Sequence, residues 1–407
     1  MSESGSETVV ADEVDLDASV AMPVTLPHVL SALSVGATAF LMVTCEFLPV
    51  GLLPGIAADL QITHGQAGLT VTIAGIMAAI GAPVVSVMAG TADRKKVLMF
   101  LSALLAISSL ITALAWSFPI VLLGRVLVGF TIGGFWTVGV GIGPRLIPEP
   151  TGTRGTAIVF GGISLGTIAG VPVGTFVGDN MGWRWAFFAA AGLSLILLVA
   201  QMKLLPKLLV RQSTKWSDLP ELLRIPNARL GLLLSIFTFG GHFFAYTYIS
   251  PFLGSYTGME MQSINALLLL YGVSGFFGNM IGSWGAGRNV RYSLVATSLI
   301  IAASVLMLTN WGSNSQAATA IVAIWGLGFG ALPIITQTWM LRAAPEAVER
   351  GAALLVSSVE IAVAAGSLAG GSVIDNLGLV STMAIGGLAV LAAAPLILIF
   401  RSTAHIK

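Results

Sequence analysis

The sequence contains few charged residues. Only 9% of its 407 residues are Asp, Glu, Lys or Arg, against roughly 25% in an average soluble protein. Because a soluble fold of this size needs more charge on its surface, soluble enzymes, nucleic-acid-binding proteins and fibrous proteins are largely excluded. With 56% apolar residues, the composition predicts an all-α integral membrane protein embedded in the lipid bilayer, with no nucleic acid as a partner.

Cysteine and histidine are also scarce. The single cysteine, Cys45, rules out an intrachain disulfide and a CxxC metal or redox site. The four histidines are scattered, without the spacing of metal ligands. No GxxxxGKS/T phosphate-binding loop is present. We therefore expect no metal and no cofactor, and we expect an ion gradient or the substrate's own gradient to supply energy.

Long apolar runs recur along the chain. A membrane-spanning helix needs about 20 mostly apolar residues, and charge, proline and glycine mark the breaks between runs. The sequence predicts twelve transmembrane helices, at residues 29–52, 66–88, 97–115, 119–142, 156–178, 183–204, 229–252, 264–285, 292–309, 316–340, 352–374 and 380–400.

Basic residues mark one side of these spans. Seventeen of the 19 Lys and Arg residues follow even-numbered spans, and cytoplasmic loops are enriched in Lys and Arg. Both termini are therefore predicted to be cytoplasmic. The expected order is an acidic tail without a signal peptide (1–28), a six-helix half (29–204), a basic cytoplasmic linker (205–228), a second six-helix half (229–400) and a short tail (401–407).

Short motifs recur at a spacing of about 196 residues. The pairs are Arg145-x-x-Pro148-Glu149 with Arg342-x-x-Pro345-Glu346, Asp179-Asn180-x-Gly182 with Asp375-Asn376-x-Gly378, and Gly129 and Gly133 with Gly326 and Gly330. Because they occur in the same order, they indicate an internal duplication. Two six-helix halves in parallel duplication resemble the layout of the major facilitator superfamily.

A row of glycines occupies one helix face in span five. Gly162, Gly166, Gly170, Gly174 and Gly178 occur at every fourth residue, and small residues at that spacing let helices approach closely in lipid. Pro172 is expected to bend this helix. The row indicates tight packing alone or a bending interface between the halves, and the sequence does not choose.

Several motifs carry a closer resemblance. Gly166-x-x-x-Gly170-x-Pro172-x-Gly174 is similar to the antiporter signature of the drug:proton antiporter branch, Arg125-x-x-x-Gly129 resembles its span-four motif, and Asp93-Arg94-Lys95-Lys96 resembles its cytoplasmic loop after span two. In that loop Ala89 replaces the leading glycine and the loop is shortened. The resemblance implies conformational or gating roles for Asp93, Arg94, Gly166, Gly170, Pro172 and Gly174.

Five further segments resemble the bacterial purine ribonucleoside efflux pumps. They are Glu46-Phe47-Leu48-Pro49-Val50, Gly133-Gly134-Phe135-Trp136, Gly182-Trp183-Arg184, Trp325-Gly326-Leu327 and Asp375-Asn376-x-Gly378-Leu379. The likeness runs from about residue 30 to the end of the chain. It implies export of purine nucleosides or bases across the bacterial inner membrane.

Away from the ends of the predicted spans, three charged residues lie where a charge is costly unless it is paired or hydrated, namely Glu46, Arg125 and Glu360. Glu46 and Arg125 each lie roughly 9 Å below the outer surface, so they can pair if their spans are neighbours. Pairing that changes between conformations would change the proton affinity of Glu46, which is what proton coupling requires. The pair is either this coupling site or a structural ion pair, and the span-four arginine of related antiporters favours coupling.

Glu360 and His242 are the other candidates for proton coupling. No basic residue in its own half matches the depth of Glu360, so it carries protons, contacts substrate or merely lines an aqueous cavity. At the repeat spacing, His242 falls on Glu46. A histidine pKa of about 6.5 suits a proton relay, but a histidine that bonds neighbouring helices is an equal alternative.

Uncharged polar and aromatic residues gather in the second half and predict the substrate site. The candidates are Trp136, Phe243, Tyr246, Asn279, Gln337 and Trp339. Aromatic rings beside amides suit flat, uncharged purines, although sugars or hydrophobic drugs would use the same groups. The leading hypothesis is a monomeric transporter, not an enzyme, that exports purine nucleosides or bases by proton antiport with alternating access. The alternatives are a proton-driven exporter of sugars or hydrophobic drugs and an inward proton symporter.

Overall fold

The computed structural model describes residues 24–147, 153–209, 222–345 and 348–399. Every regular element within these ranges is helical. Ten of the helices are long and apolar enough to cross a membrane. The predicted class, an all-α multi-pass membrane protein, is therefore confirmed. Most of both predicted tails, the middle of the predicted linker, and Pro148, Glu149 and Glu346 of the repeated motif lie outside the described residues.

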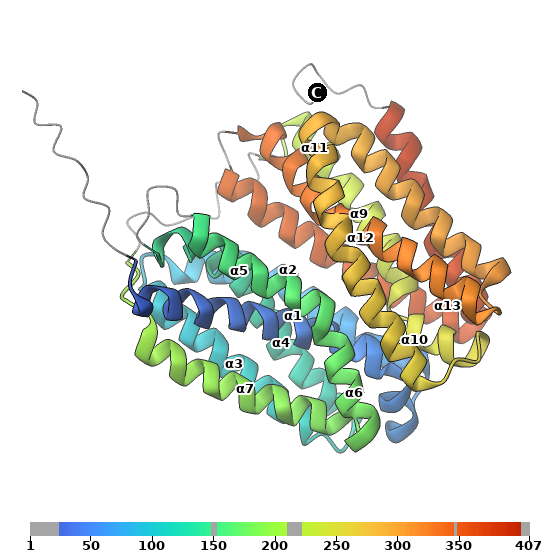
Figure 1. Ribbon diagram of the computed structural model, residues 1–407, viewed down its shortest axis with the longest axis horizontal. Helices are drawn as coiled ribbons and strands as arrows, with labels where there is room; N and C mark the ends of the chain where they lie inside the picture. Colours follow the sequence, from blue (N-terminus) through green and yellow to red (C-terminus); the bar gives the residue numbers. More distant parts are fainter. Residues whose placement is uncertain (1–23, 148–152, 210–221, 346–347, 400–407) are drawn as a thin grey trace, which may run out of the picture.

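The helices form two groups (Figure 1). The N-terminal bundle contains α1 (Leu26–Leu60), α2 (His64–Ala89), α3 (Arg94–Ala113), α4 (Phe118–Val138), η1 (Val140–Arg145), α5 (Thr153–Leu165), the π-helical η2 (Gly166–Gly170), α6 (Val171–Met181) and α7 (Trp183–Leu204). The C-terminal bundle contains α9 (Pro226–Tyr246), α10 (Ile249–Pro251), the π-helical η4 (Phe252–Tyr256), α11 (Met261–Trp311), α12 (Ser315–Ala343) and α13 (Val348–Ile399).

Polar residues that precede the apolar runs start several of these helices. The Thr63 hydroxyl accepts a hydrogen bond from the Gln66 amide at the start of α2, and Asn314 caps α12 in the same way. Such caps satisfy amide groups that have no partner inside the helix. Helices α1 and α9 begin slightly earlier than predicted, at Leu26 and Pro226, so the ends of the predicted tail and linker are helical.

Helices α11 and α13 are each interrupted once. The backbone leaves helical geometry at Asn289 (φ −154°, ψ 102°) and at Gly378 (φ 84°, ψ 178°). Gly378 ends the second copy of the Asp-Asn-x-Gly motif, and Gly182, which ends the first copy, also has a positive φ of 97°. Glycine adopts this conformation without steric cost. The motif therefore marks the same kind of break at both positions.

The repeated glycines of α4 and α12 occupy equivalent packing positions. A Cβ atom on Gly129 or Gly133 would overlap the carbonyl oxygen of Ala74 or Ala78 on α2. A Cβ atom on Gly326 or Gly330 would overlap the corresponding oxygens of Tyr271 and Gly275 on α11. The contacted residues are separated by the same interval as the glycines, so the packing of α4 on α2 recurs as α12 on α11.

The glycine row packs within the N-terminal bundle, against α1. Cβ atoms on Gly162, Gly166 and Gly170 would meet Gly36, Phe40 and Thr44 in turn. The same register recurs between α13 and α9, where Gly366 and Gly370 face Gly240 and Phe244. Because the row itself faces its own bundle, these contacts correspond to the tight-packing interpretation.

The bend expected at Pro172 takes the form of the π-helical segment η2. Proline has no amide hydrogen to bond the carbonyl of Ile168, and the chain inserts a wider turn just before it. Ile168 lies against Gly272 of α11, where a Cβ atom would meet its main chain. Within this turn, Ile168 contacts the C-terminal bundle, whereas Gly166 and Gly170 of the row face α1.

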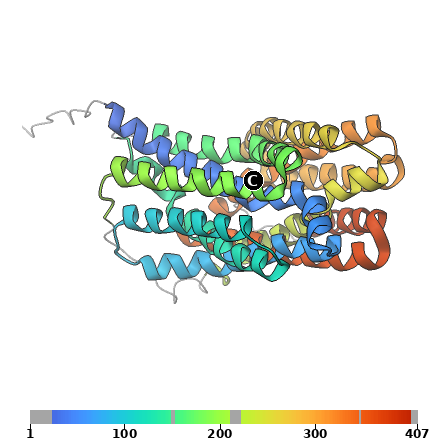
Figure 2. The same cartoon turned by 90° about the horizontal axis from the view of Figure 1, so that it is seen from below.

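The helices run side by side along the long axis of the molecule (Figure 2). The two bundles are close together around α6 and α10 and diverge with distance from these two helices (Figure 1). We call the end that carries Arg94, Lys95 and Arg342 the basic end, and the end that carries Gly182 and Gly378 the opposite end. Buried side chains from both bundles, such as Val50, Val71 and Leu253, share one apolar cluster.

Candidate functional site

A cavity of about 320 Å³ lies between the two bundles. Its wall is built from α1, α4, α5 and η2 on one side and from α9, α11, α12 and α13 on the other. Six of the predicted site residues line it, namely Glu46, Trp136, Phe243, Asn279, Gln337 and Glu360. These six residues are up to 314 positions apart in the sequence.

Two acidic side chains face this cavity, one from each bundle. Glu46 on α1 is 7% exposed and Glu360 on α13 is 5% exposed. Both line the same cavity, so ionising both would place two like charges in one low-dielectric site. A proton on either carboxyl group would relieve that repulsion.

Arg125 lies beside Glu46 but bonds to its main chain. The guanidinium donates to the carbonyl oxygens of Thr70, Cys45 and Glu46 at 2.8, 2.8 and 2.9 Å. Pro49 lacks the amide hydrogen that would bond the Cys45 carbonyl within α1, and Arg125 supplies that bond. The predicted proximity of the two residues is present, although the contact differs from the expected carboxylate pair.

An aromatic wall closes one side of the cavity. Phe47 of α1 and Phe243 of α9 stack across the two bundles with ring centroids 5.5 Å apart. Tyr271 and Phe329 also line the cavity, and their rings lie 6.2 Å apart. The sequence analysis did not select Phe47, Tyr271 or Phe329.

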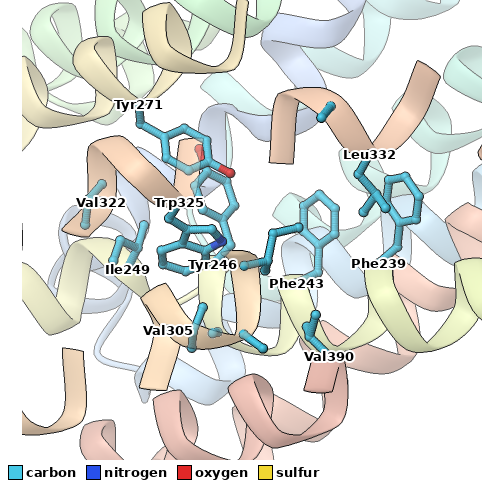
Figure 3. Packing of buried hydrophobic residues seen from close by; sticks show 14 of the residues in the cluster. Phe239, Phe243, Tyr246, Ile249, Tyr271, Val305, Val322, Trp325, Leu332 and Val390 are labelled. Atoms are coloured by element: carbon cyan, nitrogen blue, oxygen red, sulfur yellow. The ribbon is translucent and has the colours of Figure 1, made fainter. Parts of the chain in front are cut away.

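His242 and Tyr246 lie behind this wall and do not line the cavity. The Trp325 indole donates to His242 Nδ1 at 3.1 Å, and the His242 ring stacks on Tyr246 and Phe329 (Figure 3 labels Tyr246 and Trp325). Because indole nitrogen can only donate, this bond requires Nδ1 without a proton. Charging the imidazole would break the bond, so this contact disfavours a proton-coupling role for His242.

Amide side chains line the part of the cavity nearer the basic end. Asn279 of α11 and Gln337 of α12 both face it. Trp339, which was also predicted to bind substrate, instead packs within the C-terminal bundle, where its indole donates to the Asn227 carbonyl at 3.0 Å. Its position two residues after Gln337 turns it away from the cavity, since consecutive helical residues differ by about 100°.

Hydrogen bonds join the loop after α2 to the segment after α7. The Asp93 carboxylate accepts from the Lys95 amide at 3.0 Å, which caps α3, and from the Leu208 amide at 2.8 Å. The Lys95 ammonium donates to the carbonyls of Met202 and Leu205, and the Arg94 amide donates to the Leu208 carbonyl. Asp93 and Arg94 therefore connect two parts of the N-terminal bundle at the basic end.

Reciprocal contacts join the bundles at the opposite end. Asp375 of α13 accepts hydrogen bonds from the Thr63 hydroxyl at 2.6 Å and from the Gly65 amide at 3.0 Å, both at the start of α2. Asp179 of α6 accepts a hydrogen bond from Asn265 near the start of α11. The two aspartates are equivalent residues of the repeated Asp-Asn-x-Gly motif. Each copy of the motif therefore contacts the other bundle.

No cluster of three or more His, Cys, Asp or Glu side chains suited to a metal ion occurs in the described ranges. The residues that line the cavity provide carboxyl, amide and aromatic groups. These groups can exchange protons, form hydrogen bonds and stack on a flat molecule.

A family model described as the Major Facilitator Superfamily matches residues 35–355. Among curated proteins, the purine ribonucleoside efflux pump NepI of Salmonella paratyphi A is 33% identical over 353 residues, covering 86% of this chain and 89% of that protein. The protein of the same name from Escherichia coli strain K12 is 32% identical over 374 residues, covering 92% and 94%.

Solved structures share the fold. A D-xylose–proton symporter has a TM-score of 0.74 at 14% identity and covers 93% of this chain and 99% of its own. The human organic anion transporter MFSD10 has a TM-score of 0.67 at 15% identity and covers 91% and 99%. At these identities the likeness concerns the arrangement of the helices alone.

Proposed function

Because the chain belongs to the Major Facilitator Superfamily, we propose that this membrane transporter exports purine nucleosides or bases by proton antiport with alternating access. The observation that carries the proposal is the cavity between the bundles, into which Glu46 and Glu360 project from opposite sides. The family is one of transporters, so these residues are assigned to transport and not to catalysis.

We propose twelve spans in two six-helix halves. At 1.5 Å per residue, the 51 residues of α11 would extend roughly 75 Å, more than twice the hydrocarbon thickness of about 30 Å. The breaks at Asn289 and Gly378 divide α11 and α13 into two spans each, which raises the ten described spans to twelve. The repeated packing of the glycines supports the division into halves.

The basic end is proposed to face the cytoplasm of a bacterial cell, with both termini on that side of the inner membrane and the chain acting as a monomer. The arginines and lysines of this end support the orientation. The bundles diverge toward the basic end (Figure 1) and are joined at the opposite end by Asp375 and Asp179. This arrangement corresponds to a state open to the cytoplasm.

The proposed coupling uses the two carboxyl groups of the cavity. A proton that enters from outside neutralises Glu46 or Glu360 and removes the cost of a charge in a dry site. Release of the proton to the cytoplasm restores the charge before substrate binds. Arg125 fixes the main chain that carries Glu46, so the position of this carboxyl group is set by the contact of α4 with α1.

The cavity chemistry supports a flat, uncharged substrate. Phe47, Phe243 and Trp136 offer ring faces, and Asn279 and Gln337 offer hydrogen-bond donors and acceptors. The NepI relatives are named for purine ribonucleosides. The two carboxyl groups disfavour anionic substrates such as nucleotides.

Everted membrane vesicles test the proposed function. With an acidic lumen, vesicles that contain the protein are expected to accumulate radiolabelled inosine, and a protonophore is expected to abolish the accumulation. Accumulation of only arabinose or a lipophilic cation would instead support an exporter of sugars or drugs. Inosine movement out of the acidic lumen with the protons would support a symporter.

The Asp375 contact is expected to hold the cavity closed at the opposite end. Asp375→Ala removes two hydrogen bonds between the bundles, and we expect the outward-open population to rise on the order of tenfold. Spin labels at Leu114→Cys and Ser313→Cys report this as a longer distance between the bundles. Asp59→Ala is the matched control, because Asp59 pairs with Arg184 inside one bundle at 2.5 Å. An unchanged distance distribution in Asp375→Ala would contradict the prediction.

A further inference from the structure

Two buried polar atoms in the aromatic cluster have no hydrogen-bond partner. They are the Tyr271 hydroxyl and His242 Nε2. Buried polar atoms are paired in the large majority of cases, because an unpaired one costs free energy. Tyr271 is 3% exposed and its side chain lines the cavity, whereas His242 does not line it. The unpaired Tyr271 hydroxyl therefore belongs to a side chain that borders the cavity, and its oxygen is itself buried.

Contacts with neighbouring aromatic rings position the Tyr271 ring, and its hydroxyl takes no part in them. The ring stacks on Tyr246 with centroids 4.9 Å apart, and the Trp325 ring meets it edge-on at 6.0 Å. Figure 3 shows the side chains of Tyr246, Tyr271 and Trp325 gathered at one place in the C-terminal bundle. Tyr246 in turn stacks on His242, which Trp325 orients. This stack presents the hydroxyl in one position without using its hydrogen-bonding capacity.

The cavity differs in chemistry along its length. Tyr271 and Asn279 are eight residues apart on α11, as are Phe329 and Gln337 on α12, which places each pair roughly 12 Å apart along its helix. Both rings lie toward the opposite end and both amides toward the basic end. The cavity thus has an aromatic end with one hydroxyl and an amide end.

We propose that Tyr271 is a specificity-determining residue that hydrogen-bonds the purine base, while the ribose lies between Asn279 and Gln337. This assignment rests on the function proposed above and gives the substrate an orientation in the same cavity. A purine stacks on rings such as Phe243 and Phe329, and its ring nitrogens and exocyclic group match a hydroxyl that both donates and accepts. The ribose hydroxyls match two amides, each of which also donates and accepts.

Binding of a base and of its nucleoside to the purified full-length protein tests this orientation. We expect Tyr271→Phe to weaken the binding of hypoxanthine and inosine alike by about tenfold, the effect of one lost hydrogen bond. Gln337→Leu and Asn279→Leu are each expected to weaken inosine about tenfold and to leave hypoxanthine unchanged. Tyr256→Phe is the matched control, because the Tyr256 hydroxyl bonds the Thr309 carbonyl away from the cavity, and its affinities are expected to equal those of the wild type.

The outcomes separate this orientation from the proposed function. If the wild-type protein binds both ligands and Tyr271→Phe binds hypoxanthine as tightly, the orientation is wrong and the proposed function stands. The reverse pattern, in which the amide variants weaken hypoxanthine and Tyr271→Phe does not, also overturns it. If the wild-type protein binds neither ligand, the orientation and the proposed substrate class both fail. Because Tyr271→Phe removes an oxygen without a protein partner, it is not expected to impair folding.

Discussion

Replacing Glu46 with glutamine is expected to abolish export driven by a pH gradient. Glutamine has nearly the same shape as glutamate and can still form hydrogen bonds, but it cannot take up or release a proton. In everted vesicles we expect accumulation of inosine to fall to the level of vesicles without the protein. Exchange of labelled for unlabelled inosine without a gradient is expected to persist, because the aromatic and amide groups proposed to contact substrate are unchanged.

Glu260→Gln provides the matched control for this variant. Glu260 is exposed and directly precedes α11 at the opposite end, so its substitution is expected to leave gradient-driven accumulation unchanged. Export by Glu46→Gln that equals the wild type and still depends on pH would exclude Glu46 as the coupling carboxylate. Loss of exchange as well as of accumulation would place Glu46 in substrate binding instead.

Arg125→Lys is expected to destabilise the protein strongly although it preserves the charge. The guanidinium reaches carbonyls on both α1 and α2, and a single ammonium cannot reproduce this fork. The Cys45 carbonyl cannot regain a helical partner, because Pro49 has no amide hydrogen to offer. Two lost bonds to buried carbonyls amount to a destabilisation on the order of 2–5 kcal/mol. A lower midpoint of thermal unfolding in detergent measures it.

The matched control is Arg288→Lys. Arg288 is exposed and its guanidinium lies over the Trp284 ring, so the unfolding midpoint is expected to stay near that of the wild type. An Arg125→Lys protein with a wild-type midpoint would contradict the structural role. If that stable protein had also lost gradient-driven transport, the proton-transfer role implied by the resemblance would be favoured.

The helices and the repeat were predictable because lipid imposes simple rules on sequence. Apolar runs must be long enough to cross the bilayer, and close helix packing requires small residues such as Gly129 and Gly326. The structure identifies the residue on the neighbouring helix that each repeated glycine contacts. The sequence left two interpretations of the glycine row open, because the spacing identifies a helix face but not the neighbour of that face, which here is α1.

The composition of the cavity was less predictable, because a helix that is apolar on every side does not reveal which side faces the cavity. Phe243 lines the cavity, whereas Tyr246 lies on another face of α9, in the stack with His242. Trp339 likewise faces away from the cavity and donates to the Asn227 carbonyl. Tyr271 had no signal of its own in the sequence. Its proposed role rests on the unpaired hydroxyl, which is a property of the packed structure.

The contacts of Asp179 and Asp375 resemble those of a symmetric dimer interface. In such an interface, each partner offers the same patch, so one residue makes its contact twice. Here the Asp-Asn-x-Gly motif occurs twice in a single chain, and each copy contacts the start of a helix in the other bundle. A lone six-helix unit with this motif would close both contacts by pairing with a copy of itself. Because both copies of the motif lie in one chain, their sequences can differ, and so can the strengths of their contacts. The Asp179 contact and the Asp375 contact therefore need not break together.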